Sequence, residues 1–517
     1  MDRSELSGAI IQELGQIFMD AVQAVSGTVL TADLAGMEAC LQRVSRQVMG
    51  QVVERVVAVR AAGVAAPVCG PCGRAMRCAG RARPRHLQGL VGDYTLRRSY
   101  YHCAACHRGS APLDGCLGLD GGGLSPGLSR VACRAGIEGS FGAAVDHLAE
   151  TLGVTVAAEA VRRVTEGVGA VAEAEQQAVI AQAQRGQAPA PPPPATATPP
   201  ETRLVVEVDG VQAPLRDGWH ELKVSRVAPL GPELRTDPAS GRTHLALGPS
   251  GYGAGLEPAE ACWWRTYGAA CQHGFGAWVR TVVVVGDGAE WIWAAAPRFL
   301  GGAGAEVVEI VDIYHAYEHL WTVGNAVFGP GTPAAAAWVE PLKDRLYTEG
   351  APAVLAALAA LLPPDAAAAE EVRLAIGYFA SHAARMDYPR FVARRFPIGS
   401  GAVESACKTL IGQRAKQAGM RWSRPGLQAV ASLRALHRSG RWTAFWQSQP
   451  QRRRLPAHPR PPRSAPAPTP AAPPRPSSDP AADQDKRLAL VPPPPPASAR
   501  PAATHPWRRR LHPRRSA

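Results

Sequence analysis

The spacing of apolar residues predicts helices at the beginning of the chain. In residues 1–62, Ile10, Leu14 and Phe18 fall on one helical face, and a second apolar stripe runs through residues 41–56. We therefore expect two helices in this N-terminal region. Stripes of this kind serve packing or self-association, and they carry no chemistry of their own.

Residues 121–185 also have a helical pattern. We expect several short helices between Leu124 and Val168, with Gly153 at the turn between two of them. This segment is typical of a helix-turn-helix whose second helix presents Arg162 and Arg163 to DNA. The same pattern is common in helical bundles that touch no DNA, so both interpretations stay open.

After residue 201 the pattern changes to short apolar runs typical of buried strands. The predicted strands are Leu204–Asp209, Trp219–Val227, Thr243–Leu247, Val282–Asp287 and Val307–Asp312. Residues 257–272, between the third and the fourth run, have a helical pattern. Strands that alternate with helices in this way indicate an α/β fold.

Composition marks the boundaries of these parts. A chain of 517 residues can hold two or three domains. The Pro-rich stretch 186–200 predicts a linker. Of the formal net charge of +13, the part from Gln451 onward contributes 14 Lys+Arg against 3 Asp. Residues 447–517 are therefore predicted to form a disordered basic tail, suited to non-specific binding of polyanions.

The N-terminus lacks the order of charges and apolar residues found in a signal peptide, and no apolar run reaches the length of a membrane span. We expect a cytoplasmic, nucleoid-associated protein that has no membrane partner. In a reducing compartment, most of the 11 cysteines would stay reduced and be available to bind metal.

Two CxxC pairs predict a structural zinc site. Cys69 and Cys72 form the first pair, and Cys103 and Cys106 form the second. Each pair makes a tight knuckle, and four thiolates satisfy tetrahedral Zn²⁺. The segment before the second pair alternates like a strand, as a zinc ribbon requires. Unligated buried cysteines are the alternative. Substitute ligands in the same region are Cys78, His107 and, less well placed, Cys116.

Two predicted strands end in Asp-Gly, at Asp209 and at Asp287. In open α/β sheets, ligands bind beyond the carboxyl ends of strands, where both acids would lie. A third acid, Glu404, follows the turn Gly399–Gly401, in which Ser400 is placed to cap a helix. Three converging carboxylates suit Mg²⁺ or Mn²⁺ better than zinc. Singly, each Asp-Gly is also compatible with a plain turn, and Glu404 with a surface pair to Lys408.

The helix that carries Glu404 is rich in cations, which are candidates for binding the DNA backbone. These cations are Lys408, Arg414, Lys416 and Arg421. Trp422 could stack on an exposed base, although packing in the core is the interpretation we favour for it.

These motifs resemble a DDE-type insertion-sequence transposase of the IS-Kra-type branch, which has Mutator-like relatives. The resemblance covers roughly residues 60–446. Its motifs are VDG at Asp209, GDG at Asp287, D-x-x-H from Asp312 to His315, and PIGSGAVES around Glu404 followed by AGMRWS. The resemblance and the order of the predicted elements imply a ribonuclease-H-like catalytic domain. A helical insertion would occupy residues 316–396.

The resemblance also implies the chemistry. Two Mg²⁺ or Mn²⁺ ions would activate a water that cuts the transposon end, and the freed 3′-OH would then attack target DNA. Asp209 would bridge the ions, while Asp287 and Glu404 would hold one each. Asp312 and His315 would order the site, although Asp312 could instead replace Asp287 as a ligand. The implied partners are transposon-end and target DNA, and pairing of two ends implies a homodimer or larger assembly.

Two other functions remain open. One is an inactive zinc-ribbon DNA-binding protein, such as a repressor derived from a transposase, and the other is a ribonuclease-H-like nuclease. In all three cases the predicted organisation is N-terminal helices 1–62, a zinc-ribbon-like module 63–120, a helical region 121–185, a linker 186–200, a catalytic domain 201–446 and a tail 447–517.

Overall fold

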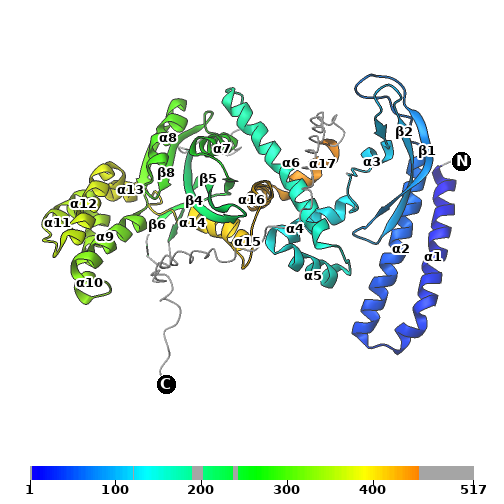
Figure 1. Cartoon of the computed structure of the whole chain (residues 1–517), viewed down its shortest axis with the longest axis horizontal. Helices are drawn as coiled ribbons and strands as arrows, with labels where there is room; N and C mark the ends of the chain where they lie inside the picture. The colour runs from blue at the N-terminus through cyan, green and yellow to red at the C-terminus, as the bar shows by residue number, and fades with distance from the viewer. Residues whose placement is uncertain (1–2, 120, 189–201, 237–240, 242, 453–517) are drawn as a thin grey trace, which may run out of the picture. The chain divides into compact units, whose positions relative to one another are not determined.

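A computed structural model describes residues 3–119, 121–188, 202–236, 241 and 243–452 (Figure 1). Most of the predicted linker and the tail beyond Arg452 lie outside these residues. Helix α17 (Trp442–Arg452) continues past Gln447, so the predicted boundary at residue 446 falls inside a helix. Its residues Trp442 and Trp446 are buried.

Two helices form the N-terminal region, as the periodicity predicts: α1 (Arg3–Thr31) and α2 (Leu34–Ala62). Asp33 begins α2, because its side chain accepts a hydrogen bond from the backbone N–H of Gly36. The two helices are joined by an ion pair of 2.7 Å between Arg55 and Glu13. Several large apolar side chains remain exposed on them, including Leu30 at 81%.

A small antiparallel sheet follows, made of β1 (Arg77–Leu87), β2 (Tyr94–His102) and the short β3 (Gly109–Ser110), with α3 (Pro112–Cys116) after it. The turn between β1 and β2 packs closely on α2. Gly92 has a φ of +137°, and a Cβ there would lie 1.9 Å from the carbonyl oxygen of Arg46. Only glycine fits this turn.

Three helices, α4 (Pro126–Glu138), α5 (Phe141–Leu152) and α6 (Ala158–Gln184), form the next region. Gly153 ends α5 in the left-handed conformation, so the predicted turn is present. Helix α6 is longer than expected and packs against α16 (Arg424–Arg438). A Cβ on Gly169 of α6 would lie 2.3 Å from the carbonyl oxygen of Ala429, so the two helices touch through their backbones.

The rest of the chain is built on a mixed sheet. Its strands are β4 (Thr202–Leu215), β5 (Gly218–Thr236), β6 (Thr243–Leu247), β7 (Gly251–Gly255), β8 (Val279–Gly286) and β9 (Glu306–Val311). The order is β6-β5-β4-β8-β9, with β7 also paired to β5. β4 pairs antiparallel with β5 and parallel with β8, and β8 pairs parallel with β9. The fold is therefore mixed α/β, as predicted.

β4 contributes to two apolar clusters at different points along its length. Leu204, Val205 and Val206 belong to a cluster with Trp263 of α7 (Ala259–Gln272). Further along the strand, Ala213 and Leu215 belong to a cluster with residues from the Glu404 region. Helix α8 (Glu290–Leu300) connects β8 to β9.

One predicted strand end is wrong. β4 does not stop at Asp209-Gly210 but continues to Leu215, because Ala213 and Leu215 bury against the second cluster. The parallel pairing with β8 does end before Asp209, at Glu207. Asp209 therefore lies where β4 leaves β8 and continues as a hairpin with β5.

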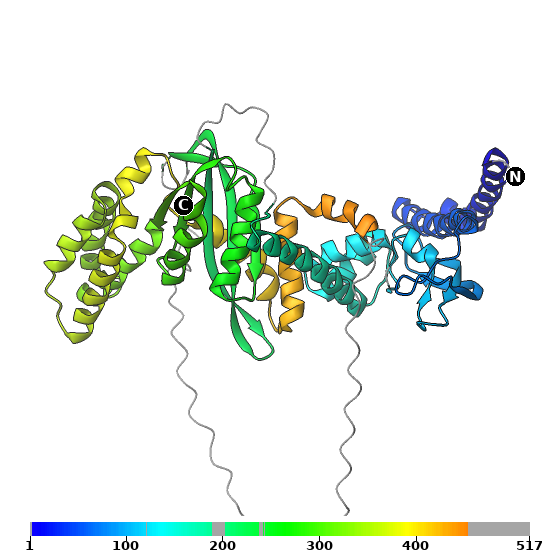
Figure 2. The ribbon, with the colours of Figure 1, turned by 90° about the horizontal axis from the view of Figure 1, so that it is seen from above.

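The segment between β9 and Glu404 is helical, as expected for an insertion. It contains α9 (Ile313–Phe328), α10 (Pro333–Glu349), α11 (Ala351–Ala359), α12 (Ala366–Ser381) and α13 (Tyr388–Ala393). These helices contact one another and form a group of their own (Figures 1 and 2). None of the helices in the described part of the chain is long and apolar enough to cross a membrane.

After the insertion come α14 (Gly401–Ala406), a π-helical turn (Cys407–Gly412) and the short α15 (Gln413–Ala415). The predicted single helix is thus interrupted from Cys407, three residues after Glu404. A π-turn changes which side chains face the sheet, because it adds a residue to the helical repeat.

Candidate metal and nucleic-acid sites

Four acids named by the sequence gather at one edge of the mixed sheet. Asp209 lies in β4, Asp287 follows β8, and Asp312 follows β9 and caps α9. Because β4, β8 and β9 run parallel, the points where they leave one another share an edge. Glu404 reaches the same edge from the first turn of α14. Charge repulsion from Asp209 and Asp312 helps to raise the pKa of Glu404, although burial is the larger cause.

The tightest group at this edge consists of Asp312, His315 and Glu404. One ligand atom from each lies within 4.8 Å of the others, so this group could hold a metal ion. The structure thus brings Glu404 to the D-x-x-H pair. Asp209 and Asp287 lie outside this group.

Asp312 is fully buried, and both of its oxygens accept hydrogen bonds. Oδ1 accepts from the backbone N–H of Tyr314 at 2.7 Å, and Oδ2 accepts from the backbone N–H of Ser400 at 2.9 Å and from the Ser400 hydroxyl. His315 Nδ1 lies 3.5 Å from Oδ2. Burial alone raises the pKa of Asp312, but the hydrogen bonds from His315 and Ser400 lower it below its ordinary value. The carboxylate is therefore kept ionised.

His315 is the counter-cation of this group. Its contact with Asp312 raises the pKa of His315 to about 9. At neutral pH the imidazole is consequently protonated, and it has no free lone pair for a metal while it stays so.

Ser400 does not have the capping role expected from the sequence. It precedes α14, but its side chain accepts no hydrogen bond from the first turn of that helix. Its hydroxyl instead contacts Asp312, and it lies 3.3 Å from Glu404 Oε1. Ser400 therefore links the end of β9 to the start of α14.

Asp209 and Asp287 are only partly buried. Asp209 accepts hydrogen bonds from the backbone N–H of Gly210 at 2.6 Å and from the thiol of Cys407 at 3.2 Å. Asp287 accepts one from the backbone N–H of Ala289 at 3.0 Å. Burial raises the pKa of Asp209, and the charge of Asp287 adds to the shift. The two carboxylates are therefore close enough to repel each other.

Sequence reasoning missed two residues near this edge. Cys407 gave no signal, because nothing in a sequence reports its contact with Asp209. Glu207 did give a signal in the sequence, because a charged residue in the middle of an apolar run needs a partner when it is buried. It is buried with Arg226 at 2.9 Å, and burial raises the pKa of Glu207 to about 7.

Two of the residues proposed to bind DNA are in the core. Arg414 is 1% exposed, and its Nε donates to the carbonyl of Gly136 at 2.9 Å. Its guanidinium lies over the rings of Phe141 and Trp422. Trp422 is 6% exposed, and its Nε1 donates to the carbonyl of Ala415 at 3.2 Å. The prediction that Arg414 and Trp422 contact DNA is therefore wrong, and the core role favoured for Trp422 is confirmed.

The other predicted DNA contacts lie on the surface. Lys408, Lys416 and Arg421 are exposed and remain candidates.

The arginines of the predicted helix-turn-helix are largely neutralised. Arg162 pairs with Glu159 and with Glu166, each at 2.6 Å, and Arg163 lies 3.7 Å from Glu159. The turn geometry is present, but these charges are paired within their own helix. Their predicted contact with DNA gains no support from the geometry.

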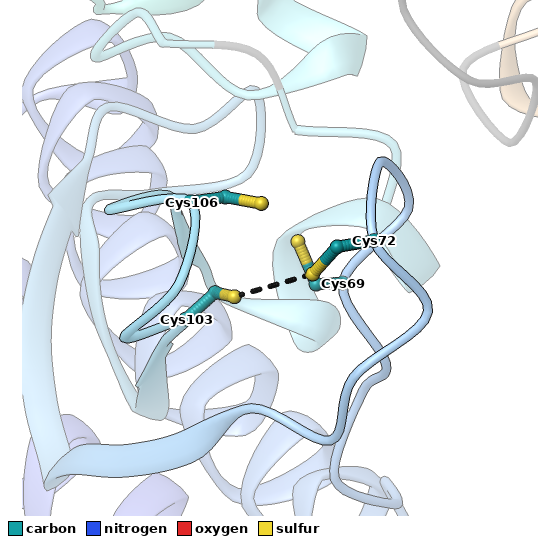
Figure 3. Close-up of side chains that lie close together, drawn as sticks. All are labelled: Cys69, Cys72, Cys103 and Cys106. Atoms are coloured by element: carbon teal, nitrogen blue, oxygen red, sulfur yellow. Dashed lines mark hydrogen bonds between the residues drawn. The ribbon is translucent and has the colours of Figure 1, made fainter.

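The four predicted cysteines converge, and their sulfur atoms point toward one another (Figure 3). The Sγ atoms of Cys72 and Cys103 lie 3.6 Å apart. All four ligand atoms lie within 4.8 Å of one another, so the group could bind a metal ion. The substitute ligands proposed from the sequence, Cys78, His107 and Cys116, are not part of the group.

The two knuckles have matching backbones. The residue after the second cysteine is in the left-handed conformation in both, Gly73 with φ +67° and His107 with φ +51°. The N–H of each first cysteine donates at 2.8 Å to the carbonyl of the residue five positions later, Arg74 or Arg108. A backbone hydrogen bond from Arg74 lowers the pKa of Cys72 to about 7. This favours the thiolate, which is the metal-binding form.

The chain matches no protein-family model and no curated protein sequence.

Proposed function

We propose that this chain is a DDE-type DNA transposase that cleaves transposon ends and joins them to target DNA. The order of the mixed sheet supports a ribonuclease-H-like catalytic domain. The first three strands along the chain are antiparallel neighbours, and β8 and β9 extend the sheet from β4 in parallel. This is the arrangement that the predicted element order requires.

The observation that carries the proposal is the set of partly buried carboxylates at one sheet edge. Asp209, Asp287 and Glu404 come from three distant parts of the chain. Burial raises the pKa of Asp209 and of Glu404, the charge of Asp287 adds to the shift of Asp209, and the charge of Asp209 adds to that of Glu404. His315 is committed to Asp312. A site that gathers negative charge beyond its cations is suited to divalent metal ions.

The donor set fits hard cations such as Mg²⁺ or Mn²⁺, because the partly exposed ligands are all carboxylate oxygens. Asp209 interacts electrostatically with both Asp287 and Glu404, which makes it the candidate bridging ligand. Ions bound there would lower the pKa of an attacking water and stabilise the leaving oxygen.

Asp312 orders the site in this proposal and is not itself a ligand. Three N–H or O–H donors and His315 already occupy its two oxygens, and the residue is fully buried. Through Ser400 it fixes the start of α14, and with it the position of Glu404. We also propose a structural Zn²⁺ at the four cysteines, within a zinc-ribbon-like module.

The test is cleavage of a duplex carrying the element's end sequence in the presence of Mg²⁺. Asp209→Asn, Asp287→Asn and Glu404→Gln should each abolish cleavage and weaken Mn²⁺ binding measured by calorimetry. Asp344→Asn is a matched control, because Asp344 is exposed on the helical insertion. Full cleavage by any of the three site variants would contradict the proposed metal site.

Two other outcomes point to the alternatives. Cleavage without joining of ends indicates a ribonuclease-H-like nuclease, and end binding without cleavage indicates an inactive repressor. Inverted repeats flanking the gene, bounded by short direct duplications, would support a transposase over both.

A further inference from the structure

The segment that contains the β1–β2 hairpin has more arginines than acidic partners for them. Between Cys69 and Ser110 the sequence has eight arginines, no lysine, no glutamate and a single aspartate, Asp93. None of the DNA contacts predicted from the sequence lies in this segment. A basic excess of this density is typical of a surface that binds phosphate.

The acids around the hairpin already have partners. Asp114 of α3 pairs at 2.7 Å with both Arg85 and Arg98. Asp93, in the turn, lies 3.9 Å from Arg46 of α2. These pairs fix the hairpin against α2 and α3, and they account for two of the eight arginines.

The other six arginines are exposed, and no ion pair is found for them among the described residues. They are Arg74, Arg77, Arg81, Arg83, Arg97 and Arg108. Arg83 stands directly opposite Arg98 across the hairpin, which places two like charges side by side. Asp114 balances the charge of Arg98, whereas no carboxylate within ion-pair distance of Arg83 is found among the described residues. Arg83 is also held over the ring of Tyr100 at 5.1 Å, so it is partly ordered before any ligand arrives.

Compensation of a metal–thiolate cluster explains only part of this charge. Four thiolates around Zn²⁺ leave a net charge of about −2. Arg74 and Arg108 lie in the knuckles, and Arg77 pairs in register with His102, which precedes Cys103. The remaining three arginines, Arg81, Arg83 and Arg97, lie further along the strands. No carboxylate among the described residues pairs with them, so their charge is available to an external anion.

The shape of the element favours DNA as that anion. The major groove of B-DNA admits a two-stranded β-ribbon, and β1 and β2 form one over most of their length, because β3 pairs only with Tyr101 and His102. The major groove of A-form RNA is too narrow to be entered. We propose that the β1–β2 hairpin binds duplex DNA through phosphate contacts of its unpaired arginines. This inference rests on the proposed function. It makes the hairpin, and not the Glu404 region, the main DNA-binding surface.

The test uses the full-length, zinc-loaded protein and a fluorescent random-sequence duplex, with no Mg²⁺ so that no cleavage occurs. Affinity is measured by anisotropy over a series of salt concentrations. The variant combines Arg81→Gln, Arg83→Gln and Arg97→Gln, the three exposed arginines that lie beyond the metal knuckles. The control combines Arg345→Gln, Arg373→Gln and Arg390→Gln, which removes the same charge from the helical insertion.

The hairpin variant should bind at least about tenfold more weakly near 0.1 M salt, with a log–log salt slope smaller by about 3, because each phosphate contact contributes about one. Zinc content equal to that of the unchanged protein shows that the module is intact. The control should retain affinity and slope. An unchanged slope in the hairpin variant overturns the inference, as does equal loss in the control.

A preference for an RNA duplex of the same length would also overturn it. None of these results bears on the metal site, because Mn²⁺ binding and cleavage by the Asp287→Asn variant are measured separately. A failure of the hairpin and a failure of the catalytic proposal can therefore be told apart.

Discussion

A thiol holds one of the carboxylates that the proposed chemistry needs. Cys407 is buried, and its Sγ lies 3.2 Å from Asp209 Oδ2. Burial and the neighbouring charge of Asp209 raise the pKa of the Cys407 thiol, so it stays protonated and acts as a donor. Since Oδ1 is held by the backbone of Gly210, the two contacts together fix the plane of the carboxylate.

Replacing this thiol should therefore weaken metal binding without removing a ligand. We expect Cys407→Ala to lower Mn²⁺ affinity by about 10-fold or more, which is typical for loss of a group that orients a ligand. Cys407→Ser keeps a donor and should restore most of the affinity. Calorimetric titration with Mn²⁺ measures this, and equal losses in both variants would show that Cys407 only fills space.

The sequence predicts the acids better than their environment. Asp209 and Asp287 stand beside glycines, Asp312 stands at a strand end, and Glu404 follows the turn Gly399–Gly401, and such positions can be recognised locally. The contacts of Ser400 and Cys407 join segments far apart in the chain, so no local pattern predicts them. Arg414 was misplaced because helical spacing cannot foresee a π-turn, or an arginine buried between two aromatic rings.

At the scale of elements, a buried polar network joins three helices. Arg265 of α7 is 2% exposed and contacts Glu257 at 2.7 Å and Glu173 of α6 at 2.9 Å. Ser432 of α16 donates to the same Glu173 at 2.7 Å. A buried arginine of this kind is stable only while its carboxylates are ionised.

The network predicts a dependence of stability on acid. Burial alone raises the pKa of Glu173, but the hydrogen bond from Arg265 lowers it below its ordinary value. A lowered pKa means that the stabilisation is present above the ordinary range of a glutamate and is lost as the pH falls through the folded value. We expect Glu173→Gln to destabilise the protein by about 1–2 kcal/mol at pH 7.

Below pH 4.5 the difference between Glu173→Gln and the unchanged protein should shrink. Urea unfolding at several pH values measures this. Glu370→Gln is the matched control, because Glu370 forms an exposed pair with Arg373 and should change stability little. A difference that stays constant down to acid pH would contradict the proposed role of Glu173.

The two cysteine knuckles predict that the chain binds zinc. The full chain should contain about one zinc, and Cys69→Ser with Cys103→Ser should remove it, because two thiolates do not close a tetrahedral site. Cys78→Ser with Cys116→Ser is the control, since neither residue belongs to the group. Metal analysis by mass spectrometry decides the question, and absence of zinc from the unchanged protein would contradict it.

Elements were predicted best where the apolar runs are long. The valine-rich strands β8 and β9 were found within a few residues, because such runs fit only a buried strand. β7 was missed, since GYGAG has no β-branched residue and pairs with β5 only because the fold places it there. The end of β4 was also wrong, because Asp-Gly usually ends a strand and here does not.

At the scale of the whole molecule, most of the net charge lies in the segment from Gln451 onward, with 14 Lys+Arg against 3 Asp. The hairpin, in contrast, concentrates its arginines in a folded element. We expect deletion of residues 453–517 to weaken binding to random DNA and to reduce its salt dependence. Stability should change by only about 0.5 kcal/mol, because no predicted core residue is removed.

Anisotropy and urea unfolding of the shortened chain measure both effects. DNA binding by the shortened chain should still depend on the hairpin arginines, because the hairpin is retained. If the shortened chain binds DNA no more weakly than the full chain, the tail makes no contribution to DNA binding.

The contact of Gly169 in α6 with Ala429 in α16 ties the segment before residues 189–201 to the far end of the chain. A protease that cuts the backbone between α6 and α16 would break the chain but leave these two helices packed together. The two pieces should co-elute from a sizing column under native conditions and part only in denaturant. Swapping the N-terminal half for that of a distant relative would consequently require α16 to be exchanged along with it.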